Sequence, residues 1–237
     1  PVFMGCVEHP IEEDLYADMV WKISEKTGTI QLSKLIPLDV LYQQEHSSGV
    51  IGRIWHDHHQ AFANFINEFS PDSIFEIGGL HGILAEKYHN SFDNIPWNIL
   101  EPNPIPTEKS KAKFEKGFFN SSYKPKFNFD TVIHSHVWEH IYEPLEFLKN
   151  ISNIMLNNEK LIFSVPNMKE MLRRNYTNCL NFEHTIFLTE ELIEFMLSNH
   201  GFEVLKKDYF LDDHSIFYST KKSDVKKTLL FDNHFSE

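Results

Sequence analysis

The chain has 237 residues, of which 41% are hydrophobic and 24% charged, and this size and balance favour one globular domain with a smaller appendage. Its 34 acidic residues outnumber the 22 basic ones, and the net charge of −12 argues against nucleic acid as a partner, because phosphate binding needs a positive face. With only two cysteines and no apolar run of about 18 residues, the sequence excludes a disulfide framework and a membrane span, and it favours a reduced, cytoplasmic compartment.

The first elements follow an irregular start. Residues 1–45 carry only short β-like runs, "MVWKI" and "TIQLS". From Trp55, apolar side chains recur at spacings of three and four, which predicts a helix that ends before Pro71. A buried strand is expected over Ile74–Ile77, and a helix over Leu80–Tyr88.

The second half continues the alternation of strands and helices. Strands are predicted at "WNILE", "KGFFNSS", "FDTVIHSH" and "EKLIFSVPN", and two more at "FEVLKKDYF" and "SIFYSTKK". One helix is predicted from Val137 to Leu156, and another begins after Thr189, a good N-cap followed by two glutamates.

This alternation predicts an α/β fold with a doubly wound, mostly parallel, Rossmann-like sheet. We expect a small N-terminal segment over 1–45, the main domain over 46–221 and a tail over 222–237. Because residue 1 is Pro and not Met, we also expect the chain to be a fragment or a trimmed product.

The stretch "EIGGLHG" lies where such a sheet binds ligands, at the carboxyl end of a strand. Gly78 suits a tight turn, and Gly82 suits close packing of the helix on the strand. Glu101 closes the next strand, where an acidic group typically accepts hydrogen bonds from ribose hydroxyls. Together these features predict a cofactor that carries a nucleoside.

The spacing of the glycines does not fit the G-x-G-x-x-G fingerprint of dinucleotide enzymes, which disfavours an NAD-dependent oxidoreductase. The acid-x-Gly-x-x-x-Gly turn, and the run "FDTVIHSHVWEHIYEPLEFLKNISNIMLNNEKLIFSVPN", resemble the class I methyltransferases that use S-adenosyl-L-methionine. The resemblance implies that Glu76, Gly78, Gly79, Gly82 and Glu101 bind this cofactor. His136, at the end of a strand, and Asn120 are further candidates. Of His134 and His136 we expect only one to face the site, and we favour His136.

Three pieces are similar to the nucleotide-sugar C-methyltransferases: "TGTIQLSKLIPLDVLYQQEHSSG", "EIGGLHG" and "NFEHTIFLTEELIEFMLSNHGFEVL". The resemblance covers roughly residues 20–216 and implies a sugar nucleotide as the small-molecule substrate. Where that family has a tyrosine and a histidine before its Glu-His pair, this chain has Asn181 and Phe182, and the family's large C-terminal domain does not follow.

Metal binding is not expected from the sequence. The family's zinc-binding cysteine pair is replaced by "SEKT" at residues 24–27, and two hydroxyls do not substitute for two thiolates. His56, His58 and His59 point to different sides of one helix, so a single ion does not collect them. We interpret them as a solvated helix face or a contact at the rim of the substrate site.

The resemblance assigns catalysis to His184 as general base, with His136 as a second candidate. Deprotonation of carbon needs a richer site than deprotonation of a hydroxyl, so the departures beside His184 favour O-methylation of a nucleotide-activated sugar or a polysaccharide precursor. C-methylation of a nucleotide keto-sugar stays open as the main alternative, with N-methylation after it. A packing role for His184 also stays open.

Leu80 stands where many methyltransferases keep a glycine. The cofactor pocket of this chain is therefore alternatively interpreted as degenerate, in which case the chain is a non-catalytic partner of another enzyme. A homodimer stays open as the assembly.

Overall fold

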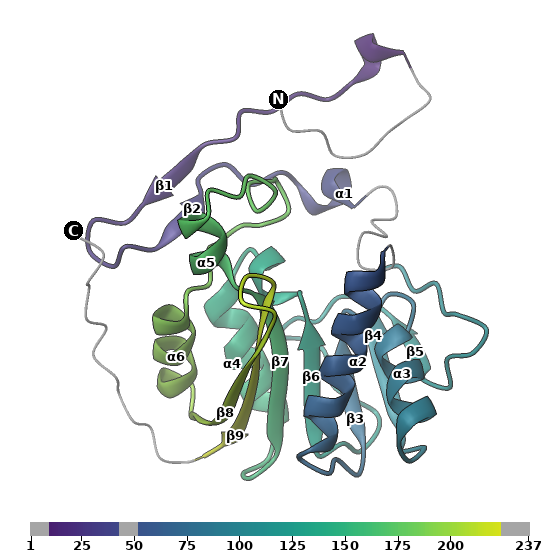
Figure 1. Ribbon diagram of the computed structural model, residues 1–237. Coiled ribbons are helices and arrows are strands. Elements are labelled where there is room, and N and C mark those ends of the chain that lie inside the picture. Colours follow the sequence, from purple (N-terminus) through teal and green to yellow (C-terminus); the bar gives the residue numbers. More distant parts are fainter. Residues whose placement is uncertain (1–9, 43–51, 224–237) are drawn as a thin grey trace.

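The computed structural model describes residues 10–42 and 52–223, and these form one layered α/β domain with an N-terminal extension (Figure 1). The main sheet has seven strands in the order β5-β4-β3-β6-β7-β9-β8. Its strands are β3 (Ile74–Ile77), β4 (Trp97–Glu101), β5 (Lys113–Lys116), β6 (Thr131–Ser135), β7 (Lys160–Pro166), β8 (Phe202–Phe210) and β9 (Ser215–Lys222). The first five run parallel, and β9 pairs antiparallel with both β7 and β8. The prediction of a mostly parallel, Rossmann-like sheet is confirmed.

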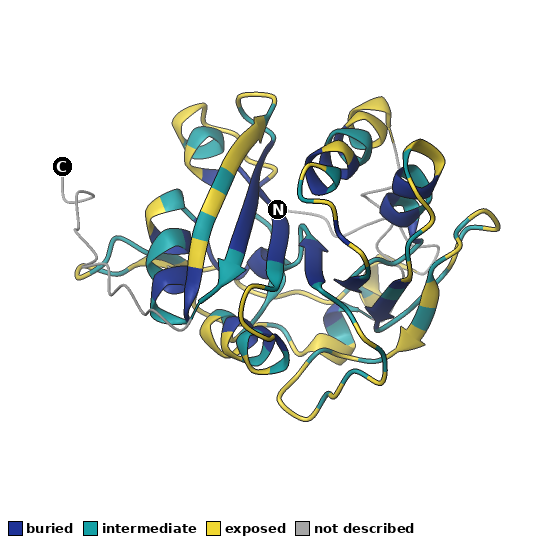
Figure 2. Cartoon of the chain, turned by 90° about the horizontal axis from the view of Figure 1, so that it is seen from below, coloured by how far each residue is buried: buried dark blue, intermediate teal, exposed yellow. Residues whose placement is uncertain are grey.

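Helices cover both faces of this sheet, and Figure 2 shows the buried strands between them. The chain forms α2 (Arg53–Asn67), α3 (Ile83–Ser91), α4 (Pro144–Ile154), α5 (Met168–Arg173) and α6 (Glu190–Asn199). Neighbouring strand residues face different cores: Ile74 packs in the core of α2 and α3, and Phe75 in the core of α4 and α6. The central parallel strands β3, β6 and β7 are therefore buried on both sides, which explains their largely apolar sequences, whereas the edge strand β5 is mostly exposed.

The N-terminal segment docks on the domain. The short 3-10 helix Ile11–Glu13 precedes β1 (Trp21–Ile23) and β2 (Ile30–Leu32), which form an antiparallel pair, and α1 (Leu38–Leu41) follows. The backbone of β2 bonds to the segment around Ile186: Leu32 N donates to Thr185 O, and Phe187 N donates to Ile30 O. Cys6 and most of the predicted tail lie outside the described residues.

Several element boundaries differ from the prediction, each for a local reason. The expected helix from Val137 to Leu156 is instead a 3-10 turn, Trp138–His140, then a break, then α4. Pro144 causes the break, since it disfavours helical backbone at Glu143 while suiting the first position of a new helix. "KGFFNSS" is not a strand: β5 ends at Lys116, and Asn120 Oδ1 accepts a hydrogen bond from Ser122 N, which forms a turn.

The helix expected from Leu80 begins only at Ile83. Leu80 and Gly82 both have left-handed backbone, with φ of 27° and 68°, which a right-handed helix excludes. The short helix α5 was not predicted. The cap at Thr189 is confirmed, because its side chain accepts from Leu192 N.

Candidate functional site

The site lies at the carboxyl ends of β3, β4 and β6. The chain runs from β3 outward to β4 on one side and later returns to β6 on the other, so the strand order reverses between β3 and β6. Loops leaving adjacent strands there diverge, and the space between them is the usual ligand crevice of such a sheet.

The loop of residues 78–82, which we call the cofactor loop, connects β3 to α3. Gly78 has a left-handed φ of 79°, and a Cβ there would lie 2.6 Å from Val137 Cγ2. A Cβ on Gly79 would lie 2.8 Å from Glu76 Cδ. These glycines therefore let the loop close against its own neighbours, whereas the sequence suggested mainly an approach to ligand. At Gly82 an added Cβ would meet Ser110 and Phe114, which agrees with the expected close packing.

Glu101 holds the cofactor loop from the adjacent strand. Its Oε2 accepts a hydrogen bond from Leu80 N at 3.2 Å, and its Oε1 accepts one from Asn103 N at 3.0 Å. A carboxylate has room for about four hydrogen bonds, so each oxygen keeps capacity for another donor. The arrangement fits a nucleoside whose ribose hydroxyls donate to this carboxylate.

Glu76 lies beneath the loop. Its residue is 3% exposed, and its Oε2 accepts from Trp97 Nε1 at 2.7 Å. Burial raises the pKa of Glu76 to about 7, although the hydrogen bond from Trp97 lowers it. Its contacts are those of a group that supports the loop from inside the protein.

Asn120 lies on the exposed turn after β5. Together with Phe119 and Ile141 it borders a surface hollow of about 290 Å³. The predicted contact between Asn120 and the cofactor stays a prediction.

Two histidines at the end of β6 differ in environment: His134 lies within the strand, and His136 follows it. His134 is 1% exposed and stacks on Phe163 at 5.0 Å, and burial lowers its pKa to about 3. His136 has left-handed backbone, with φ of 52°, and its Nε2 lies 2.9 Å from Ser215 Oγ. His134 therefore lies in the core. Residues two apart on a strand share a face, so it is the end of β6 at Ser135 and the left-handed backbone of His136 that give the two rings different surroundings. The contact of His136 with the cofactor stays a prediction.

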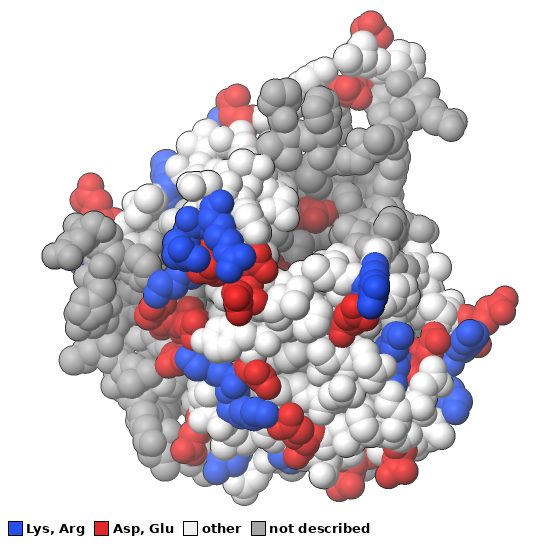
Figure 3. Space-filling model, in the orientation of Figure 1, with Lys and Arg blue, Asp and Glu red and all other residues white. Residues whose placement is uncertain are grey.

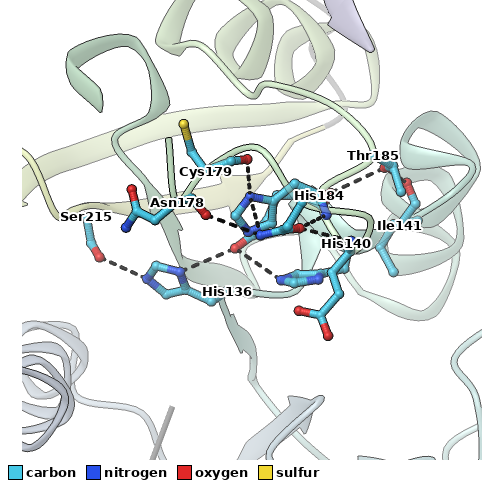
Figure 4. Close-up of polar contacts among 11 residues, drawn as sticks. His136, His140, Ile141, Asn178, Cys179, His184, Thr185 and Ser215 are labelled. Atoms are coloured by element: carbon cyan, nitrogen blue, oxygen red, sulfur yellow. Dashed lines mark hydrogen bonds and ion pairs between the residues drawn. The ribbon is translucent and has the colours of Figure 1, made fainter. Parts of the chain in front are cut away.

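Beyond His136, the chain brings together a second group, Glu139, His140 and His184, which we call the histidine cluster. Figure 4 shows His140 and His184 close to each other. One ligand atom from each lies within 4.8 Å of the other two. Glu139 is fully buried; burial would raise its pKa, but His136, His140 and His184 lower it to about 2. Burial lowers the pKa of His140, which favours its neutral form. The cluster thus holds an ionised carboxylate beside imidazole rings.

Backbone contacts hold the two segments of the cluster together. Thr185 N donates to Glu139 O at 2.8 Å, and Thr185 Oγ1 donates to Ile141 O at 2.8 Å. Because β2 pairs with the same stretch, the N-terminal segment also supports His184. Sequence reasoning missed this use of Thr185.

His184 is oriented by its own loop. Its Nδ1 lies 2.9 Å from Cys179 O, nearer than the amide nitrogen of Asn181 at 3.4 Å. A carbonyl oxygen only accepts, so Nδ1 carries the proton and donates it, and Nε2 keeps a lone pair.

The three histidines of α2 point to different sides of the helix, as predicted, but not all of them face solvent. His56 is exposed and His59 half-buried, whereas His58 is fully buried, so the interpretation as a solvated face is wrong for His58. His58 joins His136 and His214 in another group whose ligand atoms lie within 4.8 Å. The sequence offered no sign of this group because its members come from three distant segments.

Tyr42, at the end of α1, was also missed. Burial raises the pKa of its phenol, and the carboxylates of Glu183, Glu139 and Glu101 add to this effect.

The family model described as "Methyltransferase domain" matches residues 53–207, which span both the cofactor loop and the histidine cluster. No curated protein matches the sequence. No helix among the described residues is both long and apolar enough to cross a membrane.

Solved structures share the fold at low identity. An O-methyltransferase family protein from Burkholderia thailandensis has a TM-score of 0.57 and 10% identity over 72% of this chain, which spans 57% of that protein's length. An S-adenosylmethionine-dependent methyltransferase from Clostridium acetobutylicum has a TM-score of 0.52 and 13% identity, over 70% of this chain and 92% of that one. The N-methyltransferase NodS from Bradyrhizobium japonicum, solved with S-adenosyl-L-homocysteine, has a TM-score of 0.51 and 10% identity, over 72% and 88% of the two chains.

Proposed function

The chain belongs to the methyltransferase-domain family and uses S-adenosylmethionine, and from this we propose that it methylates a hydroxyl of a nucleotide-activated sugar or a polysaccharide precursor. We propose His184 as the general base. The observation that carries this role is the hydrogen bond from His184 Nδ1 to Cys179 O, which leaves the Nε2 lone pair at the carboxyl end of the sheet.

The cofactor loop and Glu101 would hold S-adenosylmethionine. When bound, this cofactor supplies a methyl group activated by a positively charged sulfur. Glu101 would accept hydrogen bonds from the ribose hydroxyls, while the buried side chain of Glu76 packs against Gly79. Their contribution is alignment of the methyl group with its acceptor.

His184 would take the proton of the acceptor hydroxyl at Nε2. The imidazole that receives this proton becomes positive, and the ionised Glu139 carboxylate nearby stabilises that charge. The cluster also lies next to the cofactor loop, because Val137, two residues before Glu139, packs against Gly78. Proton removal and methyl supply would therefore occur on neighbouring loops.

The sugar nucleotide as acceptor rests on the sequence resemblance. Basic side chains of α5 gather beside acidic ones on the face shown in Figure 3. Arg173 and Arg174 both pair with Glu170, at 2.5 and 2.6 Å. A diphosphate would have to compete with this carboxylate. A homodimeric assembly and a cytoplasmic location likewise remain predictions from the sequence.

The test is methyl transfer from radiolabelled S-adenosylmethionine to a panel of nucleotide sugars, each compared with its keto form. Label in the hydroxyl sugar, as a base-stable ether, is the expected result. Label on carbon, from the keto form alone, would contradict the proposed O-methylation. Wild-type protein should be compared with His184→Asn, so that label transferred by a contaminating enzyme is recognised.

A further inference from the structure

We propose that Glu139, His140 and His184 form a binding site for a divalent cation of the zinc, manganese or ferrous iron class, placed beside the methyl acceptor. The part about the acceptor rests on the proposed function. The site itself rests on the geometry of these three side chains alone. It lies apart from the places where the sequence led us to weigh a metal, the residues 24–27 and the histidines of α2.

The donor atoms converge. One from each side chain lies within 4.8 Å of the other two, and Glu139 Oε1 is 3.7 Å from His140 Nε2. The rings of His140 and His184 are 5.0 Å apart at an angle of 71°. Small side-chain rotations would bring such atoms to the roughly 2.0–2.2 Å that zinc requires. Two imidazoles and one carboxylate suit zinc, manganese or ferrous iron, whereas calcium prefers oxygen ligands alone.

The carboxylate of Glu139 is the second, independent observation. Its side chain is fully buried, and neither oxygen accepts a well-formed hydrogen bond from any described residue. Its ion-pair partners within the described chain are His136 and His140, with no Lys or Arg among them. A buried carboxylate is costly unless a cation compensates it, and a divalent ion at this place would do so.

The surrounding contacts preorganise the ligands. His184 donates Nδ1–H to Cys179 O, which orients the ring and leaves Nε2 free to coordinate. Such a hydrogen bond to a backbone carbonyl is the usual outer partner of a metal-bound histidine. His136 Nδ1 lies 3.3 Å from Glu139 Oε1 and would orient the carboxylate in the same way.

The neighbouring group of His58, His136 and His214 is the weaker candidate. Its ring nitrogens already bond to serine hydroxyls: His58 Nε2 to Ser164 Oγ at 3.0 Å, and His214 Nδ1 to Ser215 Oγ at 2.6 Å. None of its three members is a carboxylate that would need a counter-charge. It therefore serves as the comparison site in the test.

A cation in the histidine cluster would change the role of His184. A divalent ion lowers the pKa of an oxygen that it coordinates, so an acceptor hydroxyl on the ion would lose its proton to solvent water more readily, and the resulting alkoxide would take the methyl group. With its Nε2 lone pair on the cation, His184 acts as a ligand, and the cation replaces the free imidazole in promoting deprotonation. His184 remains essential in either case.

The test uses Co²⁺ as the probe, since its visible spectrum reports the ligands. Chelator-treated protein, desalted, is titrated with Co²⁺ by calorimetry and absorption. We expect one ion per chain in the wild type. Loss of an outer partner typically costs 10–100-fold in metal affinity, so Glu139→Gln and His184→Asn should each weaken binding by more than about 100-fold. His214→Asn, the matched control, should bind like the wild type.

Absence of Co²⁺ binding in the wild type would overturn the site, as would loss of binding in His214→Asn with retention in His184→Asn. Melting temperatures identify any variant that fails to fold, and His140→Asn then replaces it. If Co²⁺ binds as expected but no nucleotide sugar is methylated, the site stands and the proposed function fails. If methylation proceeds at full rate after chelation, the placement beside the acceptor is refuted.

Discussion

The cofactor loop and the histidine cluster lie on neighbouring strands but are built in different ways. The loop comes from one short stretch, "EIGGLHG", and is held mainly by β4 and the segment that follows it: Glu101 accepts from Leu80 N, while Ile105 N and Thr107 N donate to Leu80 O and His81 O. The cluster joins Glu139 and His140 to His184, some 45 residues away in sequence, through the hydrogen bonds of Thr185. The comparison teaches that cofactor binding here depends on local backbone shape, whereas the proposed acceptor chemistry depends on the docking of two segments. Changes in one region should therefore leave the other's property intact.

The largest effect is expected from Gly78→Val. The backbone there has a φ of 79°, and even a Cβ would overlap Val137 Cγ2 at 2.6 Å, so the loop must move. S-adenosylhomocysteine binding should become undetectable by calorimetry. Gly117→Ala is the control, because its Cβ would meet only the flexible end of Leu100 at 3.3 Å. Normal binding by the folded Gly78→Val protein would disprove the importance of this backbone shape.

His184→Asn probes the other region. Loss of a general base, or of the ligand that positions a cation, should lower kcat by roughly 10²–10⁴. His200→Asn, at the end of α6 and outside the site, should keep the wild-type rate. The measurement is steady-state methyl transfer to the best acceptor of the panel. Equal rates for the two variants would make His184 a packing residue.

The buried carboxyl of Glu76, beside the cofactor loop, should make the stability of the protein depend on pH. Its pKa is about 7 when folded against a usual 4.5, so between these values the folded state holds a proton that the unfolded state has lost. Stability should therefore fall as pH rises through this window. From pH 4.5 to 8, urea unfolding should show Glu76→Gln gaining up to about 3 kcal/mol relative to wild type. Glu108→Gln, at an exposed position, should show no such gain. An equal gain in both variants would show that Glu76 does not hold a proton in the folded state.

The two regions also differ in how much the sequence revealed. Most of the parallel sheet was predictable because its central strands are apolar runs, whereas the exposed edge strand β5 was misplaced. The position of the loop was predictable because the glycines and Glu101 have typical spacings. The predicted start of α3 was wrong because Leu80 has left-handed backbone, a conformation that leucine rarely adopts and that the sequence therefore does not indicate.

The histidine cluster was only partly predictable. His184 and His136 were named, but Glu139 was not. The break at Pro144 turns its segment into a 3-10 turn, which buries Glu139 completely. Similarly, His58 was placed on a helix surface because only the tertiary fold brings β6 and the β8–β9 turn against α2. Long-range docking of this kind leaves no periodic signal in a single sequence.

Calorimetric titration of S-adenosylhomocysteine into wild type, Glu101→Ala and His184→Asn tests the separation of the two regions most directly. Glu101→Ala should weaken binding by about 1–3 kcal/mol, the loss of charge-assisted hydrogen bonds to the ribose. His184→Asn should bind with the wild-type dissociation constant. Unchanged affinity in Glu101→Ala, or an equal loss in both variants, would contradict the assignment of cofactor binding to the loop and of acceptor chemistry to the cluster.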